Sequence, residues 1–225
     1  PIQLLTAAAA VVNGGHLMQP YVVSEILDDN GNVVEKTEPT VIRQVISEST
    51  SAIMRDMILS VVEQGTAGNA KIAGYSIGGK TGTSEKIDVY DEEGNGVDDK
   101  IVSFVGIAPM DDPQYIVLVA LDTPSTETGY YISGGVMAAP TVRGVLEDIL
   151  PYLNVARDYT GVDMSSVEVE MPALAGMTEQ EAKEALQEES LTYELIGSGS
   201  AVTGQIPQAG AKLPGNSEVI LYLSL

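Results

Sequence analysis

Residues 79–83 read Gly79-Lys80-Thr81-Gly82-Thr83, a stretch that fits two sequence patterns with incompatible structures. Together with the residues back to Gly74, it matches G-x-x-x-x-G-K-[ST], a phosphate-binding loop that leads into a helix. Read forward from Lys80, it matches Lys-Thr-Gly, the third signature of a class of enzymes with a serine nucleophile, which we expect on a β-strand. The flanking residues decide between the two.

The phosphate-loop interpretation requires a buried strand before Gly74 and a long helix from about Lys80. Residues 69–73 are too few and too polar for a central parallel strand, and residues 84–96 have no apolar 3.6-residue period. Residues 116–122 do resemble the apolar strand whose terminal Asp holds magnesium in such enzymes, although many ordinary strands end in Asp. A nucleotide-binding protein therefore stays a remote alternative.

The pentapeptide Gly74-Tyr-Ser76-Ile-Gly78 matches G-x-S-x-G, the sharp turn that carries the nucleophile of α/β-hydrolases. That turn leads into a helix and is followed along the chain by an acidic residue and then a histidine. The one histidine of the chain, His16, precedes the pentapeptide. We therefore interpret Ser76 as a polar loop residue and not as a nucleophile.

Further short blocks surround the Lys-Thr-Gly stretch over residues 1 to 153. They are Pro1-Ile-Gln-Leu-Leu-Thr6, Val12-Asn-Gly-Gly15, Pro20-Tyr-Val-Val23, Gly65-Thr-Ala-Gly68, Phe104-Val-Gly-Ile-Ala-Pro109 and Gly134-Gly-Val-Met-Ala-Ala-Pro140. In order and spacing these blocks resemble the second half of the transpeptidase domain of a class B penicillin-binding protein. The resemblance implies an α+β fold, with an antiparallel sheet covered by helices, and a peptidoglycan D,D-transpeptidase that cross-links cell-wall stem peptides by serine acyl transfer.

The same resemblance implies a substrate-binding role for the central stretch. Lys80 supplies positive charge, and the hydroxyl groups of Thr81 and Thr83 hydrogen-bond the carboxylate of a stem peptide or a β-lactam. Gly82 leaves room for a peptide along the strand edge. The backbone N–H of Thr83 is one arm of the oxyanion hole. Without the flanking blocks, these residues read as an ordinary Gly/Thr-rich strand with a solvated lysine.

The chain departs from the family pattern at the nucleophile. The covalent step requires a serine in S-x-x-K and a second motif of the S-x-N kind, and no serine of the chain has Lys at position +3 or Asn at +2. In the family both motifs precede the helix that begins near Pro1. We therefore expect a fragment that starts inside the catalytic domain, carries the substrate strand without the nucleophile, and is inactive alone.

Charge and composition exclude several classes of partner. The formal net charge is −21, with 32 acidic against 11 basic residues, which argues against nucleic acid and anionic membranes as partners. The chain has no cysteine, and therefore neither disulfides nor thiolate zinc sites. No run of about 18 apolar residues is present. From the resemblance we expect an extracytoplasmic protein on the outer face of a Gram-positive cell membrane, with an anchor outside this chain and no cofactor.

The loop at residues 88–100 is rich in acidic residues, and Asp91-x-Glu93-x-Asn95-Gly96 imitates the start of a calcium loop. Its twelfth position is Val102, where an EF-hand loop has a bidentate Glu. A solvated hairpin loop is the favoured interpretation, and we predict no metal site.

Local patterns predict the elements of the first part of the chain. We expect a buried Ala-rich helix at 2–13, a hairpin around the turn at 28–32, a helix capped by Ser47, and a last helix at 136–152. The helix after Ser47 has one apolar stripe formed by Ile53, Met57, Ile58, Val61 and Val62, with its methionines in the core. Strands are expected at 76–83, 101–108 and 115–122.

The pattern changes after residue 153. Residues 154–166 read as a linker, and residues 167–225 predict a strand, a helix with the capping box Thr178-x-x-Glu181, and three strands at 192–197, 202–207 and 218–223. The blocks Met171-Pro-Ala-Leu-Ala-Gly-Met177, Gln205-Ile-Pro-Gln-Ala-Gly210 and Leu213-Pro-Gly215 resemble a PASTA domain, a small β-α-β-β-β module of wall-associated proteins. The organisation we expect is a partial transpeptidase domain at 1–153, the linker, and one PASTA domain.

Two further expectations concern the whole chain. A wall-binding or docking module without catalysis is the main alternative function. We also expect an exposed, apolar edge at the strand of residues 115–122, where the missing half of the domain would pair, and self-association through it.

Overall fold

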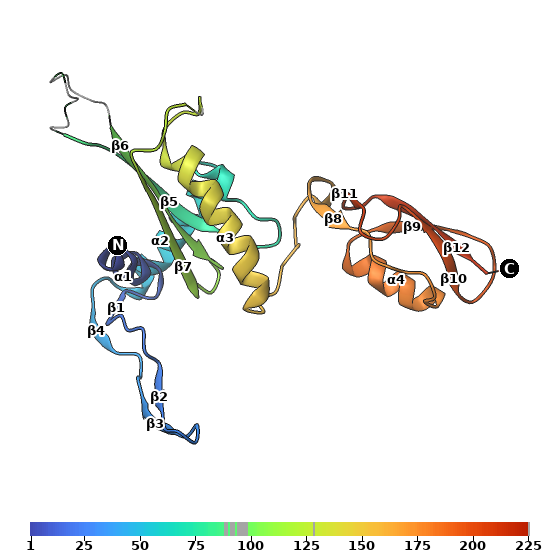
Figure 1. Cartoon of the computed structure of the whole chain (residues 1–225), viewed down its shortest axis with the longest axis horizontal. Coiled ribbons are helices and arrows are strands. Elements are labelled where there is room, and N and C mark those ends of the chain that lie inside the picture. The colour runs from blue at the N-terminus through green and yellow to red at the C-terminus, as the bar shows by residue number, and fades with distance from the viewer. Residues whose placement is uncertain (88–89, 91–92, 94–98, 128, 225) are drawn as a thin grey trace. The chain divides into compact units, whose positions relative to one another are not determined.

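The computed structural model describes residues 1–87, 90, 93, 99–127 and 129–224 (Figure 1). The chain divides into two compact units, Pro1–Asp158 and Tyr159–Leu225, so the linker expected at 154–166 straddles the division. The calcium-like stretch that begins at Asp91 lies largely outside the described residues.

The first unit is built on an antiparallel three-stranded sheet in the order β5 (Gly78–Glu85), β6 (Lys100–Ala108), β7 (Tyr115–Asp122). The apolar, β-branched sequence of β6 suits a central strand, and most of its residues are buried. The three strands expected from the sequence are therefore present, with β5 two residues later than predicted.

Helices cover both faces of this sheet. Helices α1 (Ile2–Val12) and α2 (Glu48–Glu63) lie on one face, and α3 (Ala139–Tyr152) lies on the other. Successive side chains of β6 alternate between the two layers, because Phe104 packs with α3 whereas Val105 packs with Val12 of α1. Each fully buried side chain of this size stabilises the fold by roughly 1.5–3 kcal/mol relative to exposure.

Both helices of the first layer keep apolar side chains in solvent, which corrects two expectations. Ile2 and Leu4 of α1 are more than half exposed, so the helix expected to be buried is buried mainly near its C-terminal end. Of the α2 stripe, Val62 is fully buried, but Ile53 and Met57 are 60% and 58% exposed. The 3.6-residue period predicts which residues share a face of α2, but no described element covers the N-terminal part of the stripe.

The N-cap of α2 is the predicted one, since the Ser47 hydroxyl accepts a hydrogen bond from the Thr50 N–H at 3.1 Å. The predicted last helix begins differently: a π-helical turn, η2 (Gly134–Ala138), runs directly into α3. A short 3₁₀ turn, η1 (Gly68–Ala70), follows α2.

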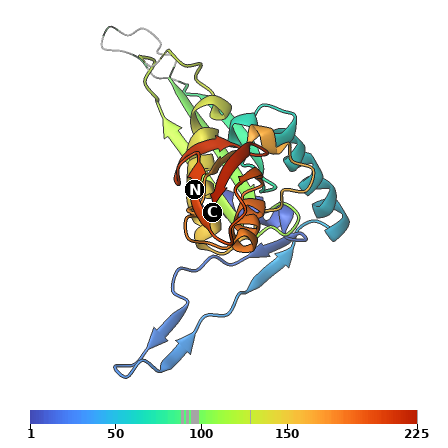
Figure 2. The ribbon, with the colours of Figure 1, turned by 90° about the vertical axis from the view of Figure 1, so that its right-hand side faces the viewer.

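A long β-hairpin extends away from the sheet (Figures 1 and 2). Its base is β1 (His16–Met18) paired with β4 (Val41–Gln44), and its end is β2 (Glu25–Leu27) paired with β3 (Val33–Lys36). The carboxylate of Asp28 accepts the backbone N–H groups of Asn30 and Asn32 at 2.9 and 2.8 Å, which builds the predicted turn.

The second unit contains two small sheets and one helix. Its elements are η3 (Met164–Ser166), β8 (Glu168–Glu170), α4 (Glu179–Glu188), β9 (Thr192–Ile196), β10 (Val202–Ile206), β11 (Lys212–Pro214) and β12 (Glu218–Leu223). Strand β12 lies between β10 and β9, parallel to β9, and β11 pairs with β8. The capping box of Thr178 and Glu181 is present as predicted. Strand β11 was not predicted.

Candidate functional site

The stretch Gly79–Thr83 lies inside strand β5. No helix begins at Lys80, so this part of the chain lacks the loop-to-helix geometry of a phosphate-binding loop. Among the described residues β5 pairs with β6 alone, which leaves its other edge without a strand partner. An open strand edge can accept an extended peptide by backbone hydrogen bonding.

Side chains of β5 alternate between the faces of the sheet. Lys80 is paired with Val105, whose side chain lies in the α1–α2 layer, whereas Thr81 is paired with Phe104, which lies in the α3 layer. Directly paired residues share a face. Lys80 and Gly82 therefore lie on the first face, and Thr81 and Thr83 on the second.

Lys80 is the exposed cation of this strand edge. Its ammonium donates a hydrogen bond to the carbonyl of Thr81 at 2.7 Å. Within the described ranges of the chain, no carboxylate lies at ion-pair distance from Lys80. A carboxylate arriving at this edge would thus meet a cation that no described carboxylate of the chain neutralises.

The glycines that open η2 lie directly against the strand. A Cβ at Gly134 would approach the Ser103 carbonyl oxygen to 2.1 Å and the Gly82 carbonyl oxygen to 2.8 Å. A Cβ at Gly135 would come within 2.3 Å of the Thr66 carbonyl oxygen. These contacts hold the Gly-Thr-Ala-Gly block, the Gly-Gly block and the Lys-Thr-Gly strand together in one place.

Ser76 links two loops by hydrogen bonds and is not placed as a nucleophile. Its hydroxyl donates to the Asp111 carboxylate at 2.7 Å and accepts the N–H of Met110 at 2.9 Å. His16 instead contacts the Asn13 carbonyl. Ser76 thus ties the loop before β5 to the loop after β6, in agreement with the polar loop residue that we predicted.

Profile comparison identifies the family of each unit. Residues 1–147 match the penicillin binding protein transpeptidase domain. The chain belongs to the penicillin-binding protein transpeptidase family. Residues 169–225 match the PASTA domain.

Individual relatives agree with this family. Stage V sporulation protein D of Bacillus subtilis is 38% identical over 233 residues, which covers 100% of this chain and 34% of that protein. The chain thus spans about a third of the length of this curated relative.

Solved structures of the same family resemble the first unit. The transpeptidase domain of penicillin-binding protein 3 from Burkholderia pseudomallei aligns with a TM-score of 0.53 and 33% identity, over 69% of this chain and 43% of that one. Penicillin binding protein 3 from Mycobacterium tuberculosis, complexed with aztreonam, aligns with a TM-score of 0.57 and 27% identity, over 70% and 36% of the two chains. The expected α+β fold, with an antiparallel sheet and covering helices, is confirmed, as is the resemblance to a transpeptidase domain followed by a PASTA domain.

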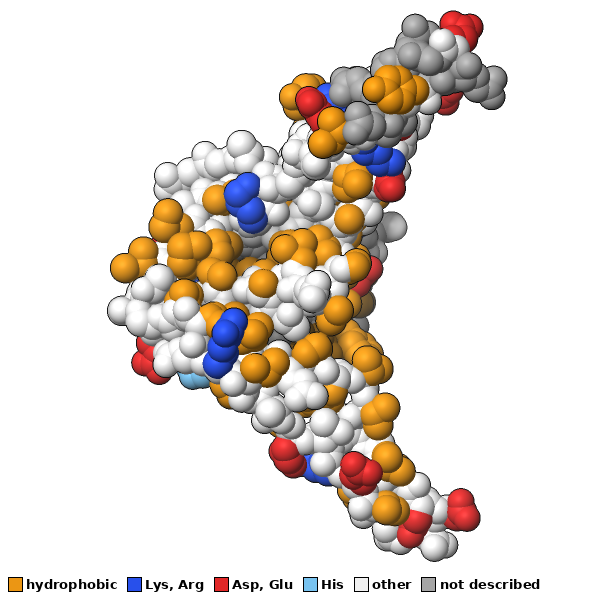
Figure 3. All heavy atoms as spheres, turned by 90° about the vertical axis from the view of Figure 1, so that its left-hand side faces the viewer, with side chains coloured by type: hydrophobic (Ala, Val, Ile, Leu, Met, Phe, Trp, Pro, Cys, Tyr) orange, Lys and Arg blue, Asp and Glu red, His pale blue; other side chains and the backbone are white. Residues whose placement is uncertain are grey.

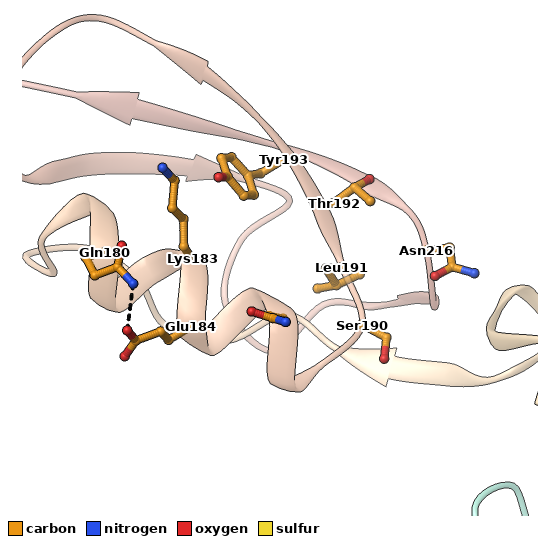
Figure 4. A pocket seen from close by; sticks show the side chains of 9 residues that line it. Gln180, Lys183, Glu184, Ser190, Leu191, Thr192, Tyr193 and Asn216 are labelled. Carbon is orange, nitrogen blue, oxygen red and sulfur yellow. Dashed lines mark hydrogen bonds between the residues drawn. The ribbon is translucent and has the colours of Figure 1, made fainter. Parts of the chain in front are cut away.

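The PASTA unit of this penicillin-binding protein has an open cleft of ≈ 670 Å³ between α4 and β9 (Figure 4). Its lining is mainly polar, and the Lys183 ammonium lies 5.7 Å from the centre of the Tyr193 ring. The pKa of Lys183 is raised by the hydrogen bond that its ammonium donates to the Glu179 carboxylate, and then by its hydrogen bond with Tyr193. No local sequence pattern predicts this contact, because Lys183 lies in α4 and Tyr193 in β9.

Proposed function

We propose that this chain supplies the substrate-binding strand of a peptidoglycan D,D-transpeptidase, which cross-links cell-wall stem peptides by serine acyl transfer. The observation that carries the proposal is the Lys80–Thr83 stretch in β5, a strand with one edge that pairs with no described strand, inside a domain of the transpeptidase family. Peptidoglycan stem peptides and β-lactams are the proposed ligands.

Each residue of the stretch has a role in this proposal. Lys80 attracts the substrate carboxylate, and Thr81 and Thr83 donate hydrogen bonds to it. Gly82 keeps the edge accessible, and the Thr83 N–H stabilises the oxyanion that forms when the acyl carbonyl is attacked. No residue of the chain is assigned as the nucleophile, and we propose that the chain alone is inactive, because it contains no S-x-x-K motif.

The proposed location is outside the cytoplasm, on the outer face of the membrane of a Gram-positive cell. Among the described residues, none of the helices has the length and apolar character needed to cross a bilayer.

A wall-binding role for the PASTA unit is the second candidate function. The cleft between α4 and β9 favours it, since amide, hydroxyl and aromatic groups such as Gln180, Thr192 and Tyr193 line it. Titration of the chain with a soluble muropeptide would test it. We expect NMR shifts confined to the cleft, whereas unchanged spectra would leave this unit a spacer.

We also propose that the isolated chain self-associates through the outer edge of β7. In the described part of the fold this strand pairs with β6 only, and most of its side chains are half-buried. An unpaired edge flanked by apolar groups favours strand pairing with a second chain.

The acylation rate of the longer protein by penicillin tests the proposed function. Lys80→Ala should lower the second-order rate constant by about 10- to 100-fold, the equivalent of losing a charged hydrogen bond. Lys36→Ala, which removes an exposed lysine from the hairpin, is the matched control and should leave the rate unchanged. Equal rates in wild type and Lys80→Ala would overturn the substrate-strand assignment. The chain alone should show no covalent label from fluorescent penicillin.

A further inference from the structure

One polar side chain outside β5 reaches the turn that packs on the substrate strand. Asn69, in η1, donates a hydrogen bond from its amide nitrogen to the carbonyl of Gly135 at 3.0 Å. Ala67 and Ala70, two residues before and one residue after Asn69, are fully buried. Because the core holds η1 in place, the Asn69 amide is a fixed support for the first turn of η2.

The first turn of η2 also contacts the side chains of Thr81 and Thr83. The N–H of Gly134 donates to the Thr83 hydroxyl oxygen at 3.4 Å. A Cβ at Gly135 would lie 3.6 Å from the Thr81 methyl carbon. The turn therefore lies on the face of β5 that carries both threonine side chains.

The hydrogen bond from the Gly134 N–H limits the directions in which the Thr83 hydroxyl can point its hydrogen. A threonine hydroxyl has one hydrogen to donate, and an ionised carboxylate can only accept hydrogen bonds. When the Thr83 oxygen accepts the Gly134 N–H, the hydroxyl hydrogen is directed away from that N–H and is left to donate to an incoming carboxylate. A displaced Gly134 would remove this orientation.

We propose that Asn69 is a positioning residue for carboxylate recognition: by holding the Gly135 carbonyl, it places the Gly134 N–H that orients the Thr83 hydroxyl. This inference rests on the proposed function, because it assigns the carboxylate of that substrate to Thr83. Asn69 itself touches no reacting atom.

The test compares benzylpenicillin with its methyl ester, which lacks the free carboxylate, as acylating agents of the longer protein. Asn69→Ala should lower the rate constant for benzylpenicillin by about 3- to 10-fold, the equivalent of one neutral hydrogen bond. The rate for the ester should stay within about 2-fold of wild type, a change below the scale of one hydrogen bond. Asn69→Gln keeps the amide donor and should recover part of the discrimination. Asn30→Ala, in the hairpin turn, is the matched control. An equal fall for both compounds would overturn the proposal, since a general structural defect does not depend on the carboxylate.

Two further measurements separate this inference from the proposed function. In a Thr83→Ala background, Asn69→Ala should have no additional effect, because coupled residues are not additive; full additivity would contradict the proposal. On this chain alone, Asn69→Ala should shift the NMR amide resonances of Gly134 and Thr83 and leave the PASTA resonances unchanged. Unshifted resonances would overturn the inference and leave the proposed function standing. An acylation rate unaffected by Lys80→Ala would instead overturn the proposed function, on which the inference rests.

Discussion

Gly79 of β5 is packed closely against the core of the sheet. A Cβ built there would come within 2.2 Å of the Phe104 ring and 2.5 Å of the Val105 carbonyl oxygen. Neither atom can move freely, since Phe104 is fully buried and the carbonyl belongs to β6. We therefore expect Gly79→Ala to destabilise the first unit by about 1–3 kcal/mol through overpacking, measured by urea unfolding.

Gly144 provides the matched control for that substitution. It is exposed within α3, and nothing lies within 4 Å of a Cβ built on it. Gly144→Ala should stabilise the chain by up to about 1 kcal/mol, because alanine has the higher helix propensity. Destabilisation of equal size in both variants would contradict the account of β5 packing.

At the residue scale, the sequence predicted the strand position of Lys80–Thr83 but not its supports. The sequences of residues 69–73 and 84–96 lack the apolar patterns of the strand and the helix that a phosphate loop requires, and this was sufficient to predict a strand for the stretch. The contacts of Asn69 with Gly135 and of Thr83 with Gly134 join positions 66 and 51 residues apart. No local pattern reports such contacts. The binding roles of the four residues remain predictions.

Helix α4 carries a pH-dependent element in its capping box. Hydrogen bonds from the Thr178 N–H and then from the Thr178 hydroxyl lower the pKa of Glu181. A carboxylate with a lowered pKa adds stability that is present above its unfolded pKa, about 4.3, and lost as the pH falls through the folded value. The thermal unfolding temperature of the PASTA unit should therefore fall on acidification below about pH 4.3.

Glu181→Gln isolates this contribution. Glutamine can complete a capping box but does not titrate. The unfolding temperature of the variant should depend less on pH than that of wild type between about pH 5 and pH 3, the window around the unfolded pKa. Parallel curves for the two proteins would show that the capping box does not contribute.

Two elements show where sequence patterns stop being informative. Strand β11 has three residues, Lys212–Pro214, and is too short to display alternation. Its pairing with β8 is a long-range contact. In α2 the apolar period predicts which residues share a face, but whether Ile53 and Met57 are covered depends on what packs there. Periodicity carries no information about that partner.

At the scale of the whole molecule, exposed apolar surface favours self-association, whereas the net charge opposes it. Apolar side chains gather across the middle of the face that Figure 3 shows. Ile2 and Leu4 of α1 are among the exposed apolar side chains of the chain. The net charge of −21 repels a second copy in dilute salt. Since the Debye length falls from about 10 Å at 0.1 M to about 3 Å at 1 M salt, self-association should strengthen with ionic strength. Light scattering across a salt series measures it.

A lysine substitution on β7 tests whether the chain self-associates through the outer edge of this strand. Ala120 is exposed on β7, and lysine on an edge strand disfavours pairing with another chain. Ala120→Lys should weaken association even though it reduces the negative charge. A monomer at every salt concentration, or association unaffected by Ala120→Lys, would rule out pairing through this edge.

The central claim is that β5 binds the carboxylate end of the substrate. A crystal structure of the longer protein acylated by a penicillin with a free carboxylate tests it most directly. We predict the carboxylate within hydrogen-bonding distance of the Thr81 and Thr83 hydroxyls, Lys80 close to it, and the acyl carbonyl oxygen on the Thr83 N–H. A carboxylate bound away from β5, or an acyl oxygen that does not contact Thr83, would contradict the account.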